Sequence, residues 1–335
     1  MVKAKIIATL GPASNKDDVI KDMIRAGMDI VRVNMSHATT IQVAQDYLEQ
    51  MNKINQVMNT NIPIMLDLKG PELRVGEVEP KTYLKKGSIV TLVCCNCEVV
   101  GNANEFSINP NCKGQLEIGD IMVVNDTALK LKVVALEPKV KIEVLKSDYL
   151  ASRKGVHVLD KSLHLPFLNL EDKATLKFAD DNNIPYVALS FVRYSKEIKE
   201  AKAFINNPLV KVYTKIETKE AIDNLDEIIN DSDGIIIARG DLSITMPYHE
   251  LGIITKKITD ACLEQDKPVY VATDLLQSMM TKPVPNKSEI ADITHVIQGG
   301  VTGCLLSGET AVGKYPVECV AVLNDIMAIV EREGK

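Results

Sequence analysis

The chain has 335 residues, enough for one large domain or two ordinary ones, and its 46% apolar and 25% charged residues are typical of a soluble globular protein. The formal net charge of −6 argues against nucleic acid or an anionic membrane surface as a partner, and no apolar run is long enough to span a membrane. Seven cysteines and an N-terminus without signal-peptide features predict reduced thiols and a cytoplasmic location.

The first part of the chain alternates between strand-like and helix-like patterns. Short apolar runs bounded by turn residues predict buried strands at 4–10, 29–34 and 62–67. Between them, a first helix is expected to start after Ser14 and end near Gly27, and a second covers about 39–57. This alternation indicates a parallel sheet covered by helices.

After Gly70 the pattern changes to one without a helical period. Short β-branched runs separated by turn residues occur at 88–93, 121–124, 130–136 and 139–145. They predict a small all-β domain over 71–165. Four cysteines in it, Cys94, Cys95, Cys97 and Cys112, match the ligand count of a zinc site. Their spacing lacks a CxxC pair, so buried or half-exposed thiols are the simpler interpretation.

From about residue 170 the alternation resumes. Helices are expected at about 171–181, 195–206, 218–229, 250–264, 287–297 and 316–332. Strands are expected at 186–190, 210–214, 234–238, 268–272 and 303–306. The total is eight strands, each followed by a helix except the third, which leads into the all-β segment. The sequence therefore predicts an α/β protein, a (β/α)₈ TIM barrel over 1–70 and 166–335 with the all-β domain inserted after strand 3.

Functional residues of such barrels come from the carboxyl ends of the strands. Here these ends carry several polar residues each: Arg32, Asn34, Ser36 and His37; Asp67, Lys69, Glu72 and Arg74; Ser190 and Arg193; Lys215 and Glu217; Arg239 and Asp241; Thr273 and Asp274; Ser307 and Glu309. Two or more at nearly every strand end indicate a site and not only solvated termini.

The residue types narrow the chemistry. Lys215 and Glu217 lie on one face of a strand because side chains alternate with period two. Glu217 and Asp241 are hard oxygen donors suited to Mg²⁺ or Mn²⁺, although each could instead pair with a neighbouring arginine. A cluster of cations suits a multiply charged anion such as phosphate: Arg32, Arg74, Arg193, Arg239 and Lys215.

Two further features of the strand ends suit ions. Asn34, Ser36 and Asp67 offer a second, less charged set of oxygen ligands for a cation. The backbone at Arg239-Gly240-Asp241 is placed to present N–H groups to an anion. Neither GxxxxGK[ST] nor GxGxxG occurs, which argues against a P-loop enzyme and a Rossmann dehydrogenase.

Several motifs in order resemble pyruvate kinase across essentially the whole chain. They are Val31–His37, Leu66–Arg74, Ser152–Val156, Ser190–Arg193, Lys215–Glu217, Ala238–Leu242 and Leu306–Ala311. The resemblance implies phosphoryl transfer from phosphoenolpyruvate to ADP, giving pyruvate and ATP in glycolysis, with Mg²⁺ (or Mn²⁺) and K⁺ as cofactors. It also implies that the all-β domain is a mobile lid.

The resemblance assigns roles to individual residues. Lys215 would sit on the transferring phosphoryl group, while Arg32 and Arg74 would clamp phosphates. Lys154 and Asp126 of the lid would approach nucleotide and metal, and Ser307 with Glu309 would support a proton relay. The divalent ion would be held by Glu217 and Asp241, and K⁺ by Asn34, Ser36, Asp67 and the carbonyl of Leu68. Glu72 matches the K⁺-dependent members. The remaining expected site residues are Arg239 in catalysis and His37, Gly240 and Asn286 in substrate or nucleotide binding.

The chain departs from the family pattern in places. Pro285-Asn286-Lys287-Ser288-Glu289 replaces Pro-Thr-Arg-Ala-Glu, so a threonine hydroxyl of the proton-delivery region is missing. Other departures are Leu68, Asn125, His157, Ser243-Ile244-Thr245, Asp274 and Gln277. We expect the transfer machinery to remain and enolate protonation to be affected. The family's C-terminal regulatory domain is also missing from this sequence, so effector control through it is not expected, and a homo-oligomer would rely on barrel contacts.

Two other functions stay open on the sequence. One is a catalytically impaired pyruvate-kinase paralogue that binds phosphoenolpyruvate or nucleotide as a sensor or partner subunit, motivated by Asn286 and the changes near Asp241. The other is an enzyme on the same scaffold that acts on a 2-oxo acid, such as a decarboxylase or aldolase. The retained lid motif Ser152-Arg-Lys-Gly155 argues against this third function, because such enzymes need no nucleotide lid.

Overall fold

The computed structural model describes residues 3–36, 40–94, 99–124, 128–159, 161 and 163–333. The chain divides into two compact units, one made of Met1–Gly70 with Leu168–Lys335 and one made of Pro71–Phe167. Among the described residues no helix is both long and apolar enough to cross a membrane.

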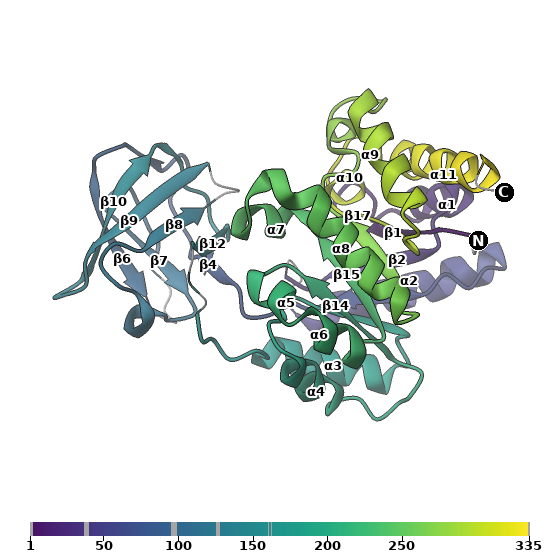
Figure 1. Ribbon diagram of the computed structural model, residues 1–335, viewed down its shortest axis with the longest axis horizontal. Helices are drawn as coiled ribbons and strands as arrows, with labels where there is room; N and C mark the ends of the chain where they lie inside the picture. Colours follow the sequence, from purple (N-terminus) through teal and green to yellow (C-terminus); the bar gives the residue numbers. More distant parts are fainter. Residues whose placement is uncertain are drawn as a thin grey trace. The chain divides into compact units, whose positions relative to one another are not determined.

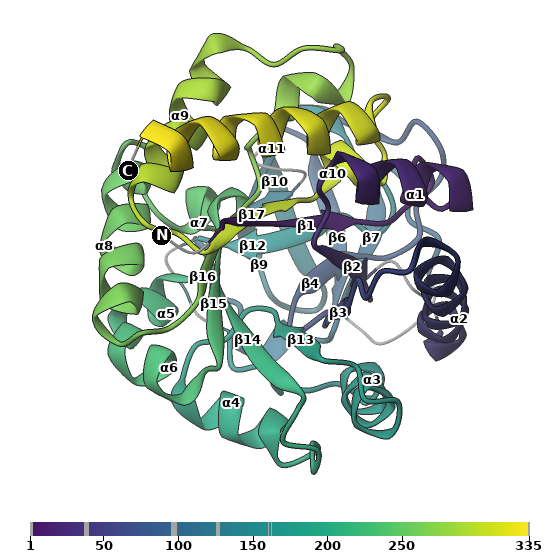
Figure 2. The ribbon, with the colours of Figure 1, turned by 90° about the vertical axis from the view of Figure 1, so that its right-hand side faces the viewer.

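Eight parallel strands close into a barrel in the first unit (Figures 1 and 2). They are β1 (Lys5–Thr9), β2 (Ile30–Asn34), β3 (Ile64–Asp67), β13 (Tyr186–Leu189), β14 (Lys211–Ile216), β15 (Gly234–Ala238), β16 (Val269–Ala272) and β17 (Gly303–Leu306). The ring runs in chain order from β1 to β17, and β17 pairs with β1 to close it. The predicted barrel is confirmed.

Helices surround this ring, as Figure 2 shows in the view toward the barrel end. They are α1 (Asp17–Ala26), α2 (Ile41–Met58), α3 (Leu170–Asp181), α4 (Ser195–Lys202), α5 (Lys219–Asp223), α6 (Leu225–Asp231), α7 (Arg239–Thr245), α8 (Leu251–Glu264), α9 (Lys287–Gln298), α10 (Gly308–Ala311) and α11 (Pro316–Glu333). Short 3₁₀ turns η2 (Tyr248–Glu250) and η3 (Gln277–Met280) lie between them.

The barrel interior is filled by side chains, with a row of tyrosines crossing it. Tyr213 makes edge-to-face contacts with Tyr186 and Tyr270, with ring centroids 5.6 and 5.9 Å apart. The Tyr213 ring occupies space left by Gly234, where a Cβ atom would lie 2.3 Å from it. Because the interior is packed, polar side chains can gather only where the strands end.

Several helix boundaries differ from the sequence predictions. Ser14 does not cap the first helix, since its Oγ accepts from Gly11 N and the helix begins at Asp17. The helix predicted over 218–229 breaks at Asn224, whose side chain donates to the carbonyls of Arg193 and Glu220. The sequence also missed the short helices α7 and α10, which follow β15 and β17 directly.

The second unit is all-β. Its strands are β4 (Leu73–Val75), β5 (Tyr83–Leu84), β6 (Ile89–Cys94), β7 (Glu105–Asn109), β8 (Ile121–Val124), β9 (Leu129–Ala135), β10 (Val140–Lys146), β11 (Asp148–Tyr149) and β12 (Gly155–Val158), with the 3₁₀ turn η1 (Lys113–Gln115). Seven of them close into a small barrel, and β5 pairs with β11. The four predicted runs correspond to β6, β8, β9 and β10.

The cysteines of this unit give no support to a zinc site. Cys94 and Cys112 are free thiols packed in its aliphatic core, and no group of three or more metal-ligating side chains occurs among the described residues. Cys95 and Cys97 lie outside the described residues.

Candidate active site

The carboxyl ends of four neighbouring strands, β2, β3, β13 and β14, bring five polar side chains together: Arg32, Asp67, Ser190, Lys215 and Glu217. Consecutive strands of the ring supply them, so residues up to 185 positions apart in the chain come together because the sheet is parallel. All five side chains are largely buried. A buried charge must be paired, and the pairs define the site.

Arg32 is bound on both sides of its guanidinium. Its Nε and one terminal nitrogen each lie 2.6 Å from Asp67 Oδ2, and the other terminal nitrogen donates to Thr9 Oγ1 at 2.8 Å. Asp67 is 1% exposed. These contacts fix the guanidinium beside Asp67, the carboxylate that also contacts Lys215.

Lys215 is the centre of the cluster. Its ammonium lies 2.9 Å from Glu217 Oε1, 3.4 Å from Asp67 Oδ2 and 2.9 Å from Ser190 Oγ. Its side chain is 13% exposed, so the charge is held by these oxygens and little by water. Burial opposes this charge, but Asp67 and Glu217 raise the pKa of Lys215 above its ordinary value.

The two carboxylates respond in opposite ways to this environment. Burial by itself would raise the pKa of Asp67, yet Lys215 and Arg32 hold it below its ordinary value. Burial raises the pKa of Glu217 to about 7; Lys215 opposes the rise, and the negative charges of Asp241 and Asp67 add to it. The two carboxylates of the cluster balance its two cations, and Asp241 adds a further negative charge near Glu217.

Glu217 and Asp241 fit a divalent cation. Glu217 Oε2 accepts from the N–H of Phe191 at 2.6 Å, which orients the carboxylate, and the charge of Asp241 disfavours its ionised form. Since no set of three metal-ligating acidic, His or Cys side chains occurs among the described residues, the ion would also use oxygens from water and substrate. Mg²⁺ is typically bound in this way.

Asn34, Ser36, Asp67 and Leu68 occupy the ends of two paired strands. Asn34 is the ladder partner of Asp67, and its Oδ1 accepts from Ser36 N at 3.0 Å. The carbonyl of Leu68 accepts from Ser190 Oγ at 2.6 Å. These oxygens are mostly uncharged, which fits a monovalent cation.

Arg239 binds the loop after β16. Its guanidinium donates to the carbonyls of Thr273 and Asp274 and lies 2.8 Å from Asp292 Oδ2. Both carbonyls belong to residues with positive φ, 65° and 54°. Gly240 N donates to Thr273 Oγ1 at 2.7 Å, so this N–H is already engaged. The arginine thus holds a strained corner of backbone.

The residues expected in proton transfer also bind backbone. Glu309 is 1% exposed and accepts from Ser307 N at 2.9 Å and from Leu276 N at 3.2 Å. Asn286 is exposed at the first turn of α9, where its N–H donates to Glu289 at 2.7 Å.

Arg193, expected in the anion cluster, pairs with a carboxylate of its own segment. Its guanidinium lies 2.6 Å from Glu197 Oε1, four residues on along the chain, and its backbone N–H donates to the same carboxylate. This pair supports the start of α4.

In the second unit, Arg74 lies 2.6 Å from Glu72 and donates to the carbonyl of Arg153 at 2.8 Å. Lys154 is exposed. His37 and Asp126, both named from the sequence, lie outside the described residues.

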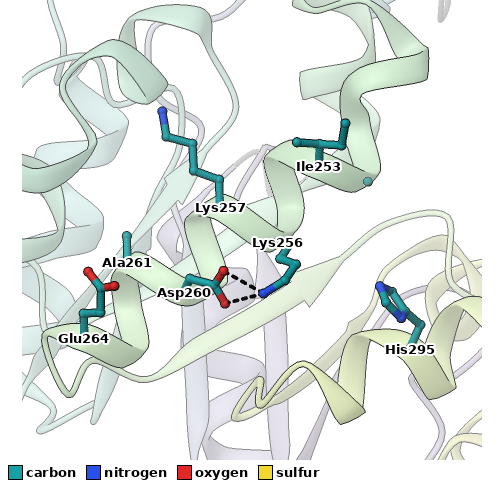
Figure 3. Close-up of a pocket in the computed structure, with 8 residues that line it drawn as sticks. Ile253, Lys256, Lys257, Asp260, Ala261, Glu264 and His295 are labelled. Carbon is teal, nitrogen blue, oxygen red and sulfur yellow. Dashed lines mark hydrogen bonds and ion pairs between the residues drawn. The ribbon is translucent and has the colours of Figure 1, made fainter.

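A surface pocket of about 660 Å³ lies on α8 beside His295 of α9 (Figure 3). In it Lys256 pairs with Asp260 at 2.7 Å, as the dashed lines show. None of the residues predicted to form the site lines this pocket. This pocket is therefore separate from the predicted site, which the buried charge cluster marks.

Sequence reasoning missed several supporting residues: Thr9, Phe191, Thr273 as a partner of Gly240, and Asp172 and Asp292. Asp172 accepts from the N–H groups of Lys69 and Gly70, at 3.0 and 3.4 Å. A signal existed in two cases. Thr9 is a polar residue at the end of the first strand, and Asp172 is three residues after the helix-capping Asn169.

Comparisons with known proteins agree on one family. The family model "Pyruvate kinase, barrel domain" matches residues 1–320. The chain is 35% identical over 339 residues to a pyruvate kinase of Clostridium acetobutylicum, covering 99% of this chain and 71% of that protein. It is 34% identical over 344 residues to a pyruvate kinase of Thermotoga maritima, covering 99% and 72%.

A solved structure is similar over the same extent. The crystal structure of a pyruvate kinase from Cryptosporidium parvum matches with a TM-score of 0.88 and 28% identity, covering 98% of this chain and 69% of that one. The similarity therefore extends over both units of the present chain.

Proposed function

Because the chain belongs to the pyruvate kinase family, we propose that its Lys215 cluster transfers the phosphoryl group of phosphoenolpyruvate to ADP, giving pyruvate and ATP. The observation that carries this proposal is the buried ammonium of Lys215, held by Asp67, Glu217 and Ser190 at the end of the barrel. Phosphoryl transfer consists mainly of positioning and charge neutralisation, and a preorganised buried cation supplies both.

In this proposal the cations of the cluster bind and orient the phosphoryl group. Lys215 donates to the oxygens of the transferring group, and Arg32 of β2, fixed by Asp67 and Thr9, anchors them as well. Glu217 and Asp241 would hold Mg²⁺ or Mn²⁺, which when bound supplies additional positive charge at the phosphates. Asn34, Ser36, Asp67 and Leu68 O would hold K⁺.

The nucleotide is the expected ligand of the second unit. Lys154 is exposed and carries its ammonium on a flexible stem of four methylenes, while the guanidinium of Arg74 is oriented by Glu72. We assign both to nucleotide phosphates. The N–H of Gly240 already donates to Thr273, so we assign Gly240 to the shape of the site and not to a hydrogen bond with the nucleotide.

The second half of the reaction is protonation of the enolate. We assign it to the region of Ser307 and Asn286, with Glu309 fixing the Ser307 backbone and Arg239 fixing the Thr273–Asp274 corner. Asn286 lacks the hydroxyl that the family's threonine offers and can only orient a water. This step is therefore expected to be slower than the phosphoryl transfer itself.

Steady-state turnover tests the proposal. Full-length protein with phosphoenolpyruvate, ADP and Mg²⁺ is expected to form pyruvate, and the rate is expected to fall when K⁺ is replaced by a larger organic cation at equal ionic strength. Folded protein that forms no pyruvate with both ions present would refute it.

Asn286, exposed at the start of α9, favours one alternative, a relative that binds without turnover. Calorimetry then discriminates, because this alternative predicts heat of phosphoenolpyruvate binding with no pyruvate formed.

A further inference from the structure

The hydroxyl of Ser190 touches three members of the candidate site. Ser190 follows β13 directly and is 3% exposed. Its Oγ lies 2.9 Å from Lys215 Nζ, 2.6 Å from Leu68 O and 3.1 Å from Asp67 Oδ1. A single buried hydroxyl thus connects the ammonium at the end of β14 to the end of β3.

The direction of each hydrogen bond is fixed by chemistry. An ammonium only donates, and a carbonyl or carboxylate only accepts. Ser190 Oγ therefore accepts from Lys215 and gives its one proton to Leu68 O or Asp67 Oδ1, of which the carbonyl is closer. The Ser190 hydroxyl therefore accepts one hydrogen bond and donates another, and an alanine at this position could do neither.

The backbone on both sides of Ser190 is held firmly. Phe191 has φ 55°, a conformation that residues with side chains rarely adopt, and its N–H donates to Glu217 Oε2. Gly70, with φ 68°, approaches so closely that a Cβ atom there would lie 2.5 Å from Ser190 O. This corner, defined as Ser190 and Phe191, therefore anchors both Lys215 and Glu217.

We propose that Ser190 is a positioning residue for phosphoryl transfer, whose hydroxyl fixes the Lys215 ammonium in place by linking it to Leu68 O and Asp67. This inference rests on the function proposed for Lys215. Without the hydroxyl, Glu217 and Asp67 are the partners that remain for the ammonium in the described part of the chain, and it moves toward them. Small displacements of a catalytic group lower the rate strongly, while substrate binding by the other cations persists.

Ser232 provides a matched control. It is 1% exposed, its Oγ lies 2.6 Å from Ile228 O and 2.7 Å from Thr214 Oγ1, and it precedes the neighbouring strand β15. Both serines bury a hydroxyl bonded to a backbone carbonyl. They differ in what the hydroxyl binds, because that of Ser190 accepts from an ammonium whereas that of Ser232 bonds a threonine hydroxyl and a carbonyl. Lys267 Nζ contacts Ser232 only at its backbone carbonyl, which an alanine keeps, so loss of the Ser232 hydroxyl reports a merely structural role.

The test compares Ser190→Ala, Ser190→Thr and Ser232→Ala in the full chain. We expect kcat to fall about 10–100-fold in Ser190→Ala with the KM for phosphoenolpyruvate changed less than about threefold. Ser190→Thr keeps the hydroxyl and is expected to regain most of that loss, while Ser232→Ala keeps kcat within about twofold. If Ser190→Ala does not fold, Ser190→Cys replaces it with the same expectation, because a thiol is a weak acceptor.

A second readout does not depend on turnover. Crystal structures of the wild type and Ser190→Ala are expected to differ by about 1 Å or more in the position of Lys215 Nζ, and Ser232→Ala to match the wild type. A wild-type protein that is inactive but shows this displacement would end the proposed function and leave the positioning role intact. Unchanged kcat in Ser190→Ala, or an unmoved Lys215 Nζ, would overturn the inference.

Discussion

Two arcs of the barrel end use charge differently. In the lysine arc, formed by Arg32, Asp67, Ser190, Lys215 and Glu217, charged side chains bind one another. In the loop arc, formed by Arg239, Thr273, Asp292, Ser307 and Glu309, they mostly bind the backbone of the loops. The first arrangement concentrates charge for a ligand, and the second fixes the shape of the walls around it.

The departures from the family pattern noted in the sequence spare the charged side chains of the lysine arc, although Leu68 and Thr245, which contact Ser190 and the Glu217 backbone, are among them. By the motif resemblance, Lys215, Glu217, Arg32 and Asp67 match the family, whereas Asn286, Asp274 and Gln277 differ from it and belong to the loops beside the loop arc. A buried charge cluster tolerates little substitution, because removing one partner leaves the other uncompensated. Loops held through main-chain atoms depend less on the identity of each side chain.

The sharpest test of the comparison is Lys215→Met, which removes the central cation of the lysine arc. We expect kcat to fall by about 10³-fold or more, since a preorganised charge at a transferring phosphoryl group contributes at least that much. Lys219→Met, four residues on, removes an exposed lysine paired with Asp223 and serves as the control. Comparable turnover in the two variants would contradict the role of the arc.

Substitutions in the loop arc are expected to lower the stability of the fold more than the rate of phosphoryl transfer. Glu309→Gln leaves one of two buried N–H groups, that of Leu276 or Ser307, without its acceptor. We expect a loss of about 2 kcal/mol in the free energy of unfolding, measured with urea. Glu318→Gln in α11 is a suitable control at a helix surface. A Glu309→Gln variant as stable as the wild type would show that the carboxylate is not a structural clamp.

The raised pKa of Glu217 makes the lysine arc sensitive to pH. Its pKa of about 7 lies above the ordinary value, so its protonation stabilises the metal-free fold at low pH and this contribution is lost as pH rises through about 7. The affinity for Mn²⁺ instead increases as pH rises, because Mn²⁺ competes with the proton for the Glu217 carboxylate. Calorimetry is expected to show Mn²⁺ affinity falling by up to about tenfold per pH unit below about pH 7. A flat profile would contradict the assignment of Glu217 as a ligand.

The smallest effect is expected at Asn286. Asn286→Thr returns a hydroxyl to the start of α9 without touching the lysine arc. Pyruvate formation should rise a few-fold, roughly 2–5, if enolate protonation limits turnover. The measurement is kcat beside that of Asn206→Thr, a substitution of the same type at a surface loop. A gain in both variants would point to a cause outside the site.

The sequence predicted the barrel because its signals are local. Each strand is a short apolar run and each helix an amphipathic one, so eight units could be counted without knowing which strands pair. The second unit was harder. Strands as short as β5, with two residues, and β11, also with two, exist through pairing with one another and carry little pattern of their own.

The sequence predicted where the site lies, but it predicted fewer of the side-chain pairs that form within it. Period two placed Lys215 beside Glu217, and 2.9 Å separates them. The pairing of Arg193 with Glu197, four residues on, was not predicted, although charged side chains at this spacing often pair on a helix. The link from Ser190 to Lys215 could not be read from the chain, since 25 residues separate them and only the register of β13 and β14 joins them.

Because β1 pairs with β17, the ring can close only after the last strand has been synthesised. Thr9 N donates to Thr310 Oγ1, and the same hydroxyl donates to Thr9 O, across 301 residues of chain. At about 5–20 residues per second of synthesis, the first strand therefore waits roughly 15–60 seconds with one open edge. An unpaired edge strand is a template for aggregation, so the interval before β17 emerges is when the nascent chain most needs protection.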